Sequence, residues 1–202
     1  IQVRYEMKLL IFSGFLGSGK TTIIQKVIRS MTARGETVAI IENEIGKVGI
    51  DQELLAETGI KITPLFGGCV CCQISGDLLT ATQKIQAEIN PDWIVVELTG
   101  MATLTKIIDL FARYGDPDLP ILTVAIVDAS RWEVLYKIAT PLLEQQLQGA
   151  KAVVVNKIDV TMPSPQLLDQ MARLAPGAAI LPIAASEING VELLSRLEEA
   201  LY

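Results

Sequence analysis

The chain contains no histidine, and Phe, Trp and Tyr make up only 5% of its 202 residues. The absence of histidine excludes it as a metal ligand or general base anywhere in this sequence. Lysine and arginine number 17 against 23 acidic residues, so the net charge is −6. Such a chain lacks the basic surface that attracts nucleic acids and anionic membranes, and we expect neither as a partner.

Long apolar runs are also missing. None approaches the ~20 residues that cross a bilayer, and no stretch is long enough for the apolar part of a signal peptide. We therefore expect a cytoplasmic protein. The three cysteines all lie between positions 69 and 72. An odd, clustered set without a secretion signal is not typical of a disulfide framework.

Half of the residues are hydrophobic, and most of these are aliphatic. Short continuous apolar runs alternate with helical segments, which is typical of strands buried on both faces and covered by helices. This alternation predicts an α/β fold with a mainly parallel sheet. We expect a single domain over residues 8–202, preceded by an N-terminal extension of residues 1–7 in which Met7 is a candidate natural start.

The predicted strands are Lys8–Ser13, Thr37–Ile41, Lys61–Leu65, Trp93–Val96, Ile121–Val127, Ala152–Val155 and Ala179–Ile183. The predicted helices lie near Thr21–Arg34, Gln52–Glu57, Gly76–Ile89, Thr103–Arg113, Arg131–Gln148, Pro165–Leu174 and Val191–Leu201. The chemically distinctive residues fall just after strands, namely Gly14, Glu42, Cys69, Glu97, Asn156 and Ser186. In an open parallel sheet these positions line one edge, where ligands bind.

The strongest motif is Gly14-Phe15-Leu16-Gly17-Ser18-Gly19-Lys20-Thr21-Thr22, between the first strand and the first helix. It fits G-x-x-x-x-G-K-[ST], whose glycines let backbone N–H groups point inward around an anion at the positive end of a helix. Lys20 is expected to reach the β- and γ-phosphates, and Thr21 to offer a hydroxyl to Mg²⁺. The motif in this context favours a P-loop NTPase three-layer sandwich over a glycine-rich turn that binds nothing. The expected nucleotide contacts are Gly14, Gly17, Ser18, Gly19, Lys20, Thr21 and Thr22.

A second motif, Asn156-Lys157-Ile158-Asp159, follows a buried strand. The Asp159 carboxylate can accept two hydrogen bonds from N1–H and the N2 amine of guanine, a donor pair that adenine lacks. Asn156 would tie this loop to the phosphate loop, and the Lys157 stem would cover a face of the base. A capping role for Asp159 is the alternative. The loop after the last strand, which includes Ser186, is expected to add backbone N–H contacts to guanine O6.

A third motif, Glu97-Leu98-Thr99-Gly100, ends another buried strand. Glu97 is placed to hold Mg²⁺ through water, as the Walker-B carboxylate does in P-loop enzymes, and Gly100 to offer its N–H to the γ-phosphate. The alternative for Glu97 is a plain carboxylate at a strand end. We assign catalytic roles to Lys20, Thr21 and Glu97, and magnesium binding to Thr21 and Glu97. Slow intrinsic hydrolysis is expected, because no glutamine follows this motif to orient a water molecule.

The cysteine segment Cys69-Val70-Cys71-Cys72 offers at most three thiolates. Three protein ligands and an open position suit metal catalysis or transfer better than a closed structural zinc site. Thiolates select Zn²⁺, Cu(I) or a similarly thiophilic ion over Mg²⁺. The alternative is that these cysteines are small buried packing residues. Glycines 67 and 68 before them, and polar residues 73 and 75 after them, favour a loop.

Together these stretches resemble a family of P-loop GTPases that includes the cobalamin-biosynthesis protein CobW and the GTPases that help load metal into urease and hydrogenase. The resemblance rests on Gly14–Thr22, Glu97–Gly100, Asn156–Asp159 and the C-x-C-C segment, with Ile41–Gly46 similar to the switch segment of the CobW branch. It implies hydrolysis of GTP to GDP, and a metallochaperone or maturation role toward a client metalloprotein. It also implies Glu42 as a metal ligand beside Cys71 and Cys72.

Two other classes of function stay open from the sequence. The first is a small-molecule kinase that holds ATP in the phosphate loop, although the Asn-Lys-x-Asp motif favours guanine. The second is a non-enzymatic zinc or thiol module on a nucleotide-binding scaffold. The sequence leaves open a homodimer, the identity of the client, the physiological metal and the sign of any coupling between metal and nucleotide.

Overall fold

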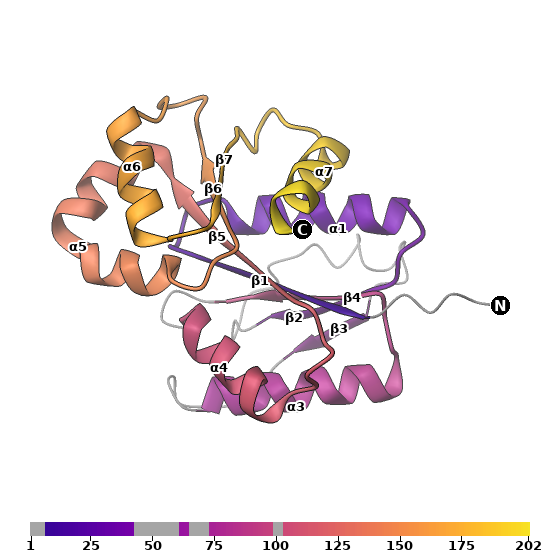
Figure 1. The fold of residues 1–202 in the computed structure, drawn as a ribbon. Helices are drawn as coiled ribbons and strands as arrows, with labels where there is room; N and C mark the ends of the chain where they lie inside the picture. Colours follow the sequence, from indigo (N-terminus) through magenta and orange to yellow (C-terminus); the bar gives the residue numbers. More distant parts are fainter. Residues whose placement is uncertain (1–6, 43–60, 65–72, 99–102) are drawn as a thin grey trace.

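The structure is a computed structural model that describes residues 7–42, 61–64, 73–98 and 103–202 (Figure 1). Within these ranges the strands form one parallel sheet in the order β3-β2-β4-β1-β5-β6-β7. The strands are β1 (Lys8–Gly14), β2 (Val38–Glu42), β3 (Lys61–Pro64), β4 (Trp93–Glu97), β5 (Ile121–Asp128), β6 (Ala152–Asn156) and β7 (Ala179–Pro182). The helices are α1 (Lys20–Ala33), α3 (Gln73–Glu88), α4 (Leu104–Tyr114), the short 3₁₀ turn η1 (Ala129–Arg131), α5 (Trp132–Leu147), α6 (Pro165–Leu174) and α7 (Gly190–Leu201).

Each predicted strand is present, and the α/β fold is confirmed. The strand ends differ from the prediction by a residue or two, and β5 continues to Asp128, one residue beyond the predicted end. The predicted helix over residues 131–148 begins only at Trp132, because Asp128 accepts a hydrogen bond from the Ser130 backbone N–H and caps a separate 3₁₀ turn. The predicted helix Gln52–Glu57 lies outside the described residues.

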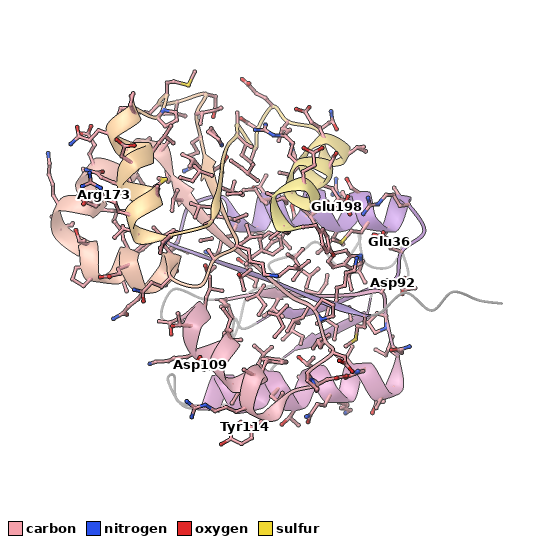
Figure 2. The ribbon with its side chains drawn as sticks, viewed as in Figure 1. Glu36, Asp92, Asp109, Tyr114, Arg173 and Glu198 are labelled. Atoms are coloured by element: carbon pink, nitrogen blue, oxygen red, sulfur yellow. The ribbon has the colours of Figure 1, made fainter. Side chains whose placement is uncertain are left out.

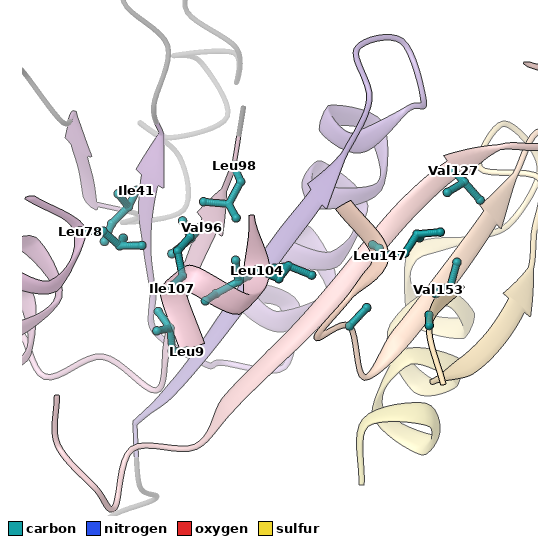
Figure 3. Packing of buried hydrophobic residues seen from close by; sticks show 14 of the residues in the cluster. Leu9, Ile41, Leu78, Val96, Leu98, Leu104, Ile107, Val127, Leu147 and Val153 are labelled. Carbon is teal, nitrogen blue, oxygen red and sulfur yellow. The ribbon is translucent and has the colours of Figure 1, made fainter. Parts of the chain in front are cut away.

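The sheet is the middle layer of three. Helices α1 and α7 cover one face, and α3, α4, α5 and α6 cover the other (Figure 1). Alternate residues of β1 supply both cores: Leu9 and Ile11 face the larger helical group, and Leu10 and Phe12 face α1 and α7. Figure 3 shows aliphatic side chains from several elements that pack in the core on the α3, α4, α5 and α6 side of the sheet. Burial on both faces explains why the strands are continuous apolar runs.

The amino ends of β2 and β4 are tied together away from the phosphate loop. Asp92 accepts hydrogen bonds at 2.7 Å from both the backbone N–H and the hydroxyl of Thr37. Nearby, Arg34 pairs with Glu198 at 2.7 Å and with Glu36 at 3.2 Å, which joins the end of α1 to α7 (Figure 2). These contacts are partly exposed, so each adds little stability. The functional residues lie at the opposite edge of the sheet, formed by the carboxyl ends of the strands.

At that opposite edge the strand register aligns the ends of neighbouring strands. Glu97 pairs with Phe12 of β1 on one side and with Glu42 of β2 on the other. Asp128 pairs with Asn156 where β5 meets β6. In the described part of the chain, no helix combines the length and apolarity needed to cross a membrane.

Candidate nucleotide-binding site

The phosphate loop leaves β1 in a conformation that requires glycine. Gly14 has φ 140°, and a Cβ atom there would lie 2.2 Å from the carbonyl oxygen of Ile126 on β5. Gly19 has φ 93°, and its Cβ would lie 2.3 Å from the side-chain nitrogen of Asn156. Gly17 also has positive φ, at 79°. A larger residue at 14 would therefore push the loop off β5, and one at 19 would displace the Asn156 side chain.

The loop leads directly into α1, whose N-cap is Gly19 and carries no side-chain cap. The N–H groups of a first helical turn have no partner within the helix, so they can bind an anion. Lys20 is buried and donates from Nζ to the carbonyls of Gly14 at 2.9 Å and Phe15 at 3.2 Å. The positive-φ glycines, the uncapped helix start and the adjacent ammonium group fit a phosphate chain.

The two predicted magnesium ligands lie together. The Thr21 hydroxyl donates to Glu97 Oε1 at 3.4 Å, although the residues are 76 positions apart in the sequence. Thr21 lies in the first turn of α1, and Glu97 is the last residue of β4. A hydroxyl and a carboxylate are hard oxygen donors, which Mg²⁺ prefers. The pair fits a magnesium ion held by one hydroxyl, one carboxylate and water.

Asn156 joins the second motif to the phosphate loop, as predicted. Its side-chain nitrogen donates to the Ser18 carbonyl at 2.8 Å, and its side-chain oxygen accepts the Ala185 N–H at 2.9 Å. The residue is only 2% exposed. One buried amide therefore holds three segments together: the phosphate loop, the end of β6 and the loop after β7.

Lys157 makes contacts that sequence reasoning did not anticipate. Its backbone has φ 65°, a left-handed conformation that is uncommon for a residue other than glycine. Its ammonium group donates to the Gly17 carbonyl at 2.8 Å and to Asp128 Oδ2 at 2.7 Å. The predicted contact between the lysine stem and a base stays a prediction.

Asp128 is buried and receives three hydrogen bonds. Besides Lys157, the Ser130 backbone N–H donates at 2.9 Å and the Ser130 hydroxyl at 2.6 Å, both to Oδ1. Burial by itself raises the pKa of Asp128, but the hydrogen bonds from Lys157 and Ser130 and the charge of Lys157 outweigh it, so the pKa lies below its ordinary value. Asp128 therefore caps the η1 turn and also forms an ion pair with Lys157, neither of which the sequence motifs predicted.

Asp159 and Ser186 are joined by a side-chain hydrogen bond. The Ser186 hydroxyl donates to Asp159 Oδ2 at 3.0 Å, and both residues are exposed. The carboxylate assigned to guanine is therefore open to solvent and oriented by the loop after β7. Sequence reasoning assigned that loop to backbone contacts and did not predict this side-chain contact.

The predicted transition-metal site lies mostly outside the described residues. This applies to Cys69, Cys71 and Cys72, and also to Gly100 of the third motif. For Glu42 the backbone is described, and its Cα pairs with that of Glu97 in the neighbouring strand. Within the described residues, no group of three or more Cys, Asp or Glu side chains is arranged to hold a metal ion.

The fold and this edge of the sheet define a P-loop nucleotide-binding protein with a guanine-type motif. Comparison with known families gives the same result: the family described as "CobW/HypB/UreG, nucleotide-binding domain" matches residues 8–181. The chain belongs to this family, and the resemblance inferred from its motifs is confirmed.

Curated relatives include "Zinc chaperone YjiA" of Escherichia coli, 29% identical over 187 residues, which are 89% of this chain and 58% of the relative. Another is "Zinc-regulated GTPase metalloprotein activator 1" of Dictyostelium discoideum, 28% identical, with 82% of this chain and 38% of the relative covered. The chain therefore spans less than two thirds of the length of these curated relatives.

Solved structures share the fold. Hydrogenase maturation factor HypB from Archaeoglobus fulgidus aligns with a TM-score of 0.71 at 16% identity, over 98% of this chain and 92% of HypB. The Zn(II)-bound YjiA GTPase from Escherichia coli aligns with a TM-score of 0.69 at 24% identity, over 93% of this chain and 60% of YjiA. At these identities the alignments support the P-loop GTPase architecture alone.

Proposed function

We propose that this chain binds GTP with Mg²⁺, hydrolyses it to GDP, and uses the nucleotide state to control transfer of Zn²⁺ or another thiophilic metal to a client metalloprotein. One observation carries the nucleotide half of this proposal. Asn156 of the guanine motif donates to Ser18 of the phosphate loop at 2.8 Å, so the two motifs form one continuous site. Separate motifs that met by chance in a sequence would not be expected to share a buried hydrogen bond.

Each residue of the site has a role that follows from its position. The N–H groups of the phosphate loop and of the first turn of α1 would bind the phosphates, and Lys20 would exchange its bonds to loop carbonyls for phosphate oxygens. Asp159, exposed at the outer end of the site, would select guanine. Thr21 and Glu97 would hold Mg²⁺, which neutralises charge on the β- and γ-phosphates in enzymes of this type.

Catalysis would then rest on positioning and electrostatic stabilisation. The sequence has no histidine to serve as a general base. Without a partner that completes the site, turnover should therefore be slow.

The metal half of the proposal rests on the thiophilic Cys69-Val70-Cys71-Cys72 segment and on the sheet register. Glu42, an expected ligand, ends β2 directly beside Glu97, an expected magnesium ligand that ends β4. A change in the metal ligated by either carboxylate would therefore change the electrostatic surroundings of the other, on the neighbouring strand. The names of the relatives, which are zinc chaperones and a zinc-regulated activator, support zinc as the cargo.

The experiment is purification without oxygen, followed by metal analysis and by titration of GTP, GDP and ATP. We expect GTP and GDP to bind far more tightly than ATP, and bound zinc to be lost in the Cys71→Ser variant. Equal affinity for ATP would favour a kinase instead. Zinc binding without any nucleotide affinity would favour a plain metal module.

Coupling between the two ligands is measured by zinc titration of the GDP form and the GTP-analogue form, beside Glu42→Ala. Linkage requires each ligand to change the affinity of the other by the same factor, typically about 5- to 150-fold. Metal uptake should release protons, because cysteine thiols must lose their protons to bind the metal. Identical zinc affinity in both nucleotide states would reject the coupling.

A further inference from the structure

In the phosphate loop, the backbone carbonyl of each residue from 14 to 18 accepts a hydrogen bond from a side chain. Lys20 donates to Gly14 and Phe15. The other three carbonyls accept from outside the loop: Leu16 from Arg131 at 3.2 Å, Gly17 from Lys157 at 2.8 Å and Ser18 from Asn156 at 2.8 Å. The loop is therefore held from outside by donors that come from the ends of β5 and β6.

This arrangement matters because a phosphate-binding loop needs its N–H groups to converge on the anion. The carbonyls must then turn outward, where water or protein side chains can donate to them. Leu16 is 83% exposed and Gly17 is also exposed, so the apolar core does not fix this part of the loop. The cations at residues 131 and 157 provide the donors that packing cannot provide.

Both cations depend on Asp128. Its Oδ2 accepts from Lys157 at 2.7 Å, and its Oδ1 accepts from the backbone and hydroxyl of Ser130, which forms the 3₁₀ turn that carries Arg131. The carboxylate is itself buried, with its side chain 4% exposed. A single buried group therefore fixes the positions of two donors that hold consecutive loop carbonyls.

We propose that Asp128 and Arg131 are positioning residues for nucleotide binding: through Lys157 and the η1 turn, they keep the phosphate loop in its anion-binding shape before the nucleotide arrives. Nucleotide then binds a preformed site and does not have to order the loop. This inference rests on the proposed nucleotide binding. It adds two residues that neither the sequence motifs nor the family match assigns to the site.

The test compares Arg131→Ala, Asp128→Asn and the double variant with the unmodified chain. Arg173→Ala is the control, because Arg173 is an exposed arginine on α6 (Figure 2). Affinities for GDP, a non-hydrolysable GTP analogue and GMP are measured with Mg²⁺ by competition against a fluorescent GDP. GMP is informative because it lacks the β-phosphate that the loop cradles. Thermal unfolding of each nucleotide-free variant is recorded in parallel.

Arg131→Ala should weaken GDP and the GTP analogue by the same factor, about tenfold, which is the worth of one charge-assisted hydrogen bond. The affinity for GMP should fall much less, and Arg173→Ala should leave all three affinities unchanged. Asp128→Asn should weaken GDP binding at least as much as Arg131→Ala does. The double variant should weaken it by less than the product of the two factors, because both residues act through the η1 turn.

Three results would overturn the inference. The first is unchanged GDP binding by Arg131→Ala. The second is an equal loss for GMP, and the third is a loss confined to the GTP analogue, which would make Arg131 a direct γ-phosphate ligand. Failure of the unmodified chain to bind any guanine nucleotide would instead reject the proposed function.

Discussion

The Ser186 hydroxyl donates to the Asp159 carboxylate at 3.0 Å, so the residue assigned to guanine is oriented by a loop from the next strand. An exposed carboxylate held from one side still offers its other oxygen to a ligand. Guanine can donate to both carboxylate oxygens only if the Ser186 hydroxyl rotates away or donates to the same oxygen as guanine does. Base selection should therefore depend strongly on Asp159 and weakly on Ser186.

Asp159→Asn should weaken GTP binding by about 10- to 100-fold, because a two-bond contact to a base is worth about 1–3 kcal/mol. The amide should in turn accept xanthosine triphosphate, whose extra carbonyl needs a donor. Titrations of GTP, XTP and ATP measure both effects. Asp169→Asn, at an exposed position on α6, is the matched control and should leave all three affinities unchanged. Retention of GTP preference by Asp159→Asn would refute the assignment.

Lys20→Ala should abolish GTP hydrolysis, because the loop loses the cation beside its phosphate site. Phosphate release under single-turnover conditions is the measurement. Lys106→Ala, an exposed lysine on α4, should hydrolyse GTP at the unmodified rate. Without a partner that rate should lie below the ~1–10³ s⁻¹ range typical of enzymes. Faster unaided turnover would contradict a mechanism based on positioning alone.

Asn156→Ala should lower the free energy of unfolding by about 2–4 kcal/mol, because it leaves the buried Ser18 carbonyl and Ala185 N–H without this partner. Urea denaturation of the nucleotide-free protein measures the change. Asn189 offers a comparison, since it caps α7 from an exposed position. Asn189→Ala should cost about 1 kcal/mol. Equal losses in the two variants would show that Asn156 acts as an ordinary cap.

Acid should remove the stability that Asp128 provides. Its pKa is lowered in the folded protein. A group with a depressed pKa stabilises the fold above its unfolded pKa of about 3.9, and loses that contribution as pH falls through its folded pKa. Urea midpoints of the unmodified chain and Asp128→Asn should therefore differ by a constant amount above about pH 5 and converge in stronger acid. A difference between the two urea midpoints that grows as pH falls would contradict a stabilising role for the Asp128 carboxylate.

Much of this protein could be predicted from its sequence, for a local physical reason. Strands buried on both faces must be continuous apolar runs, so the alternation with helices indicated the fold class. Phosphate binding needs glycines where no Cβ fits, and Gly14 and Gly19 lie against Ile126 and Asn156 with no room for one. The pairing of Thr21 with Glu97 also followed, because residues after parallel strands share one edge.

The tertiary structure alone decided the strand order and the contacts that cross between strand ends. No local pattern places β4 between β2 and β1, or sets Asp128 beside Asn156. Arg131 was predicted as the first residue of a helix, and only the folded chain shows that it donates to the Leu16 carbonyl, 115 positions away. A sequence motif predicts the local conformation of the backbone. The donors that hold that backbone in place come from distant strands, and their pairing depends on packing that no short stretch of sequence contains.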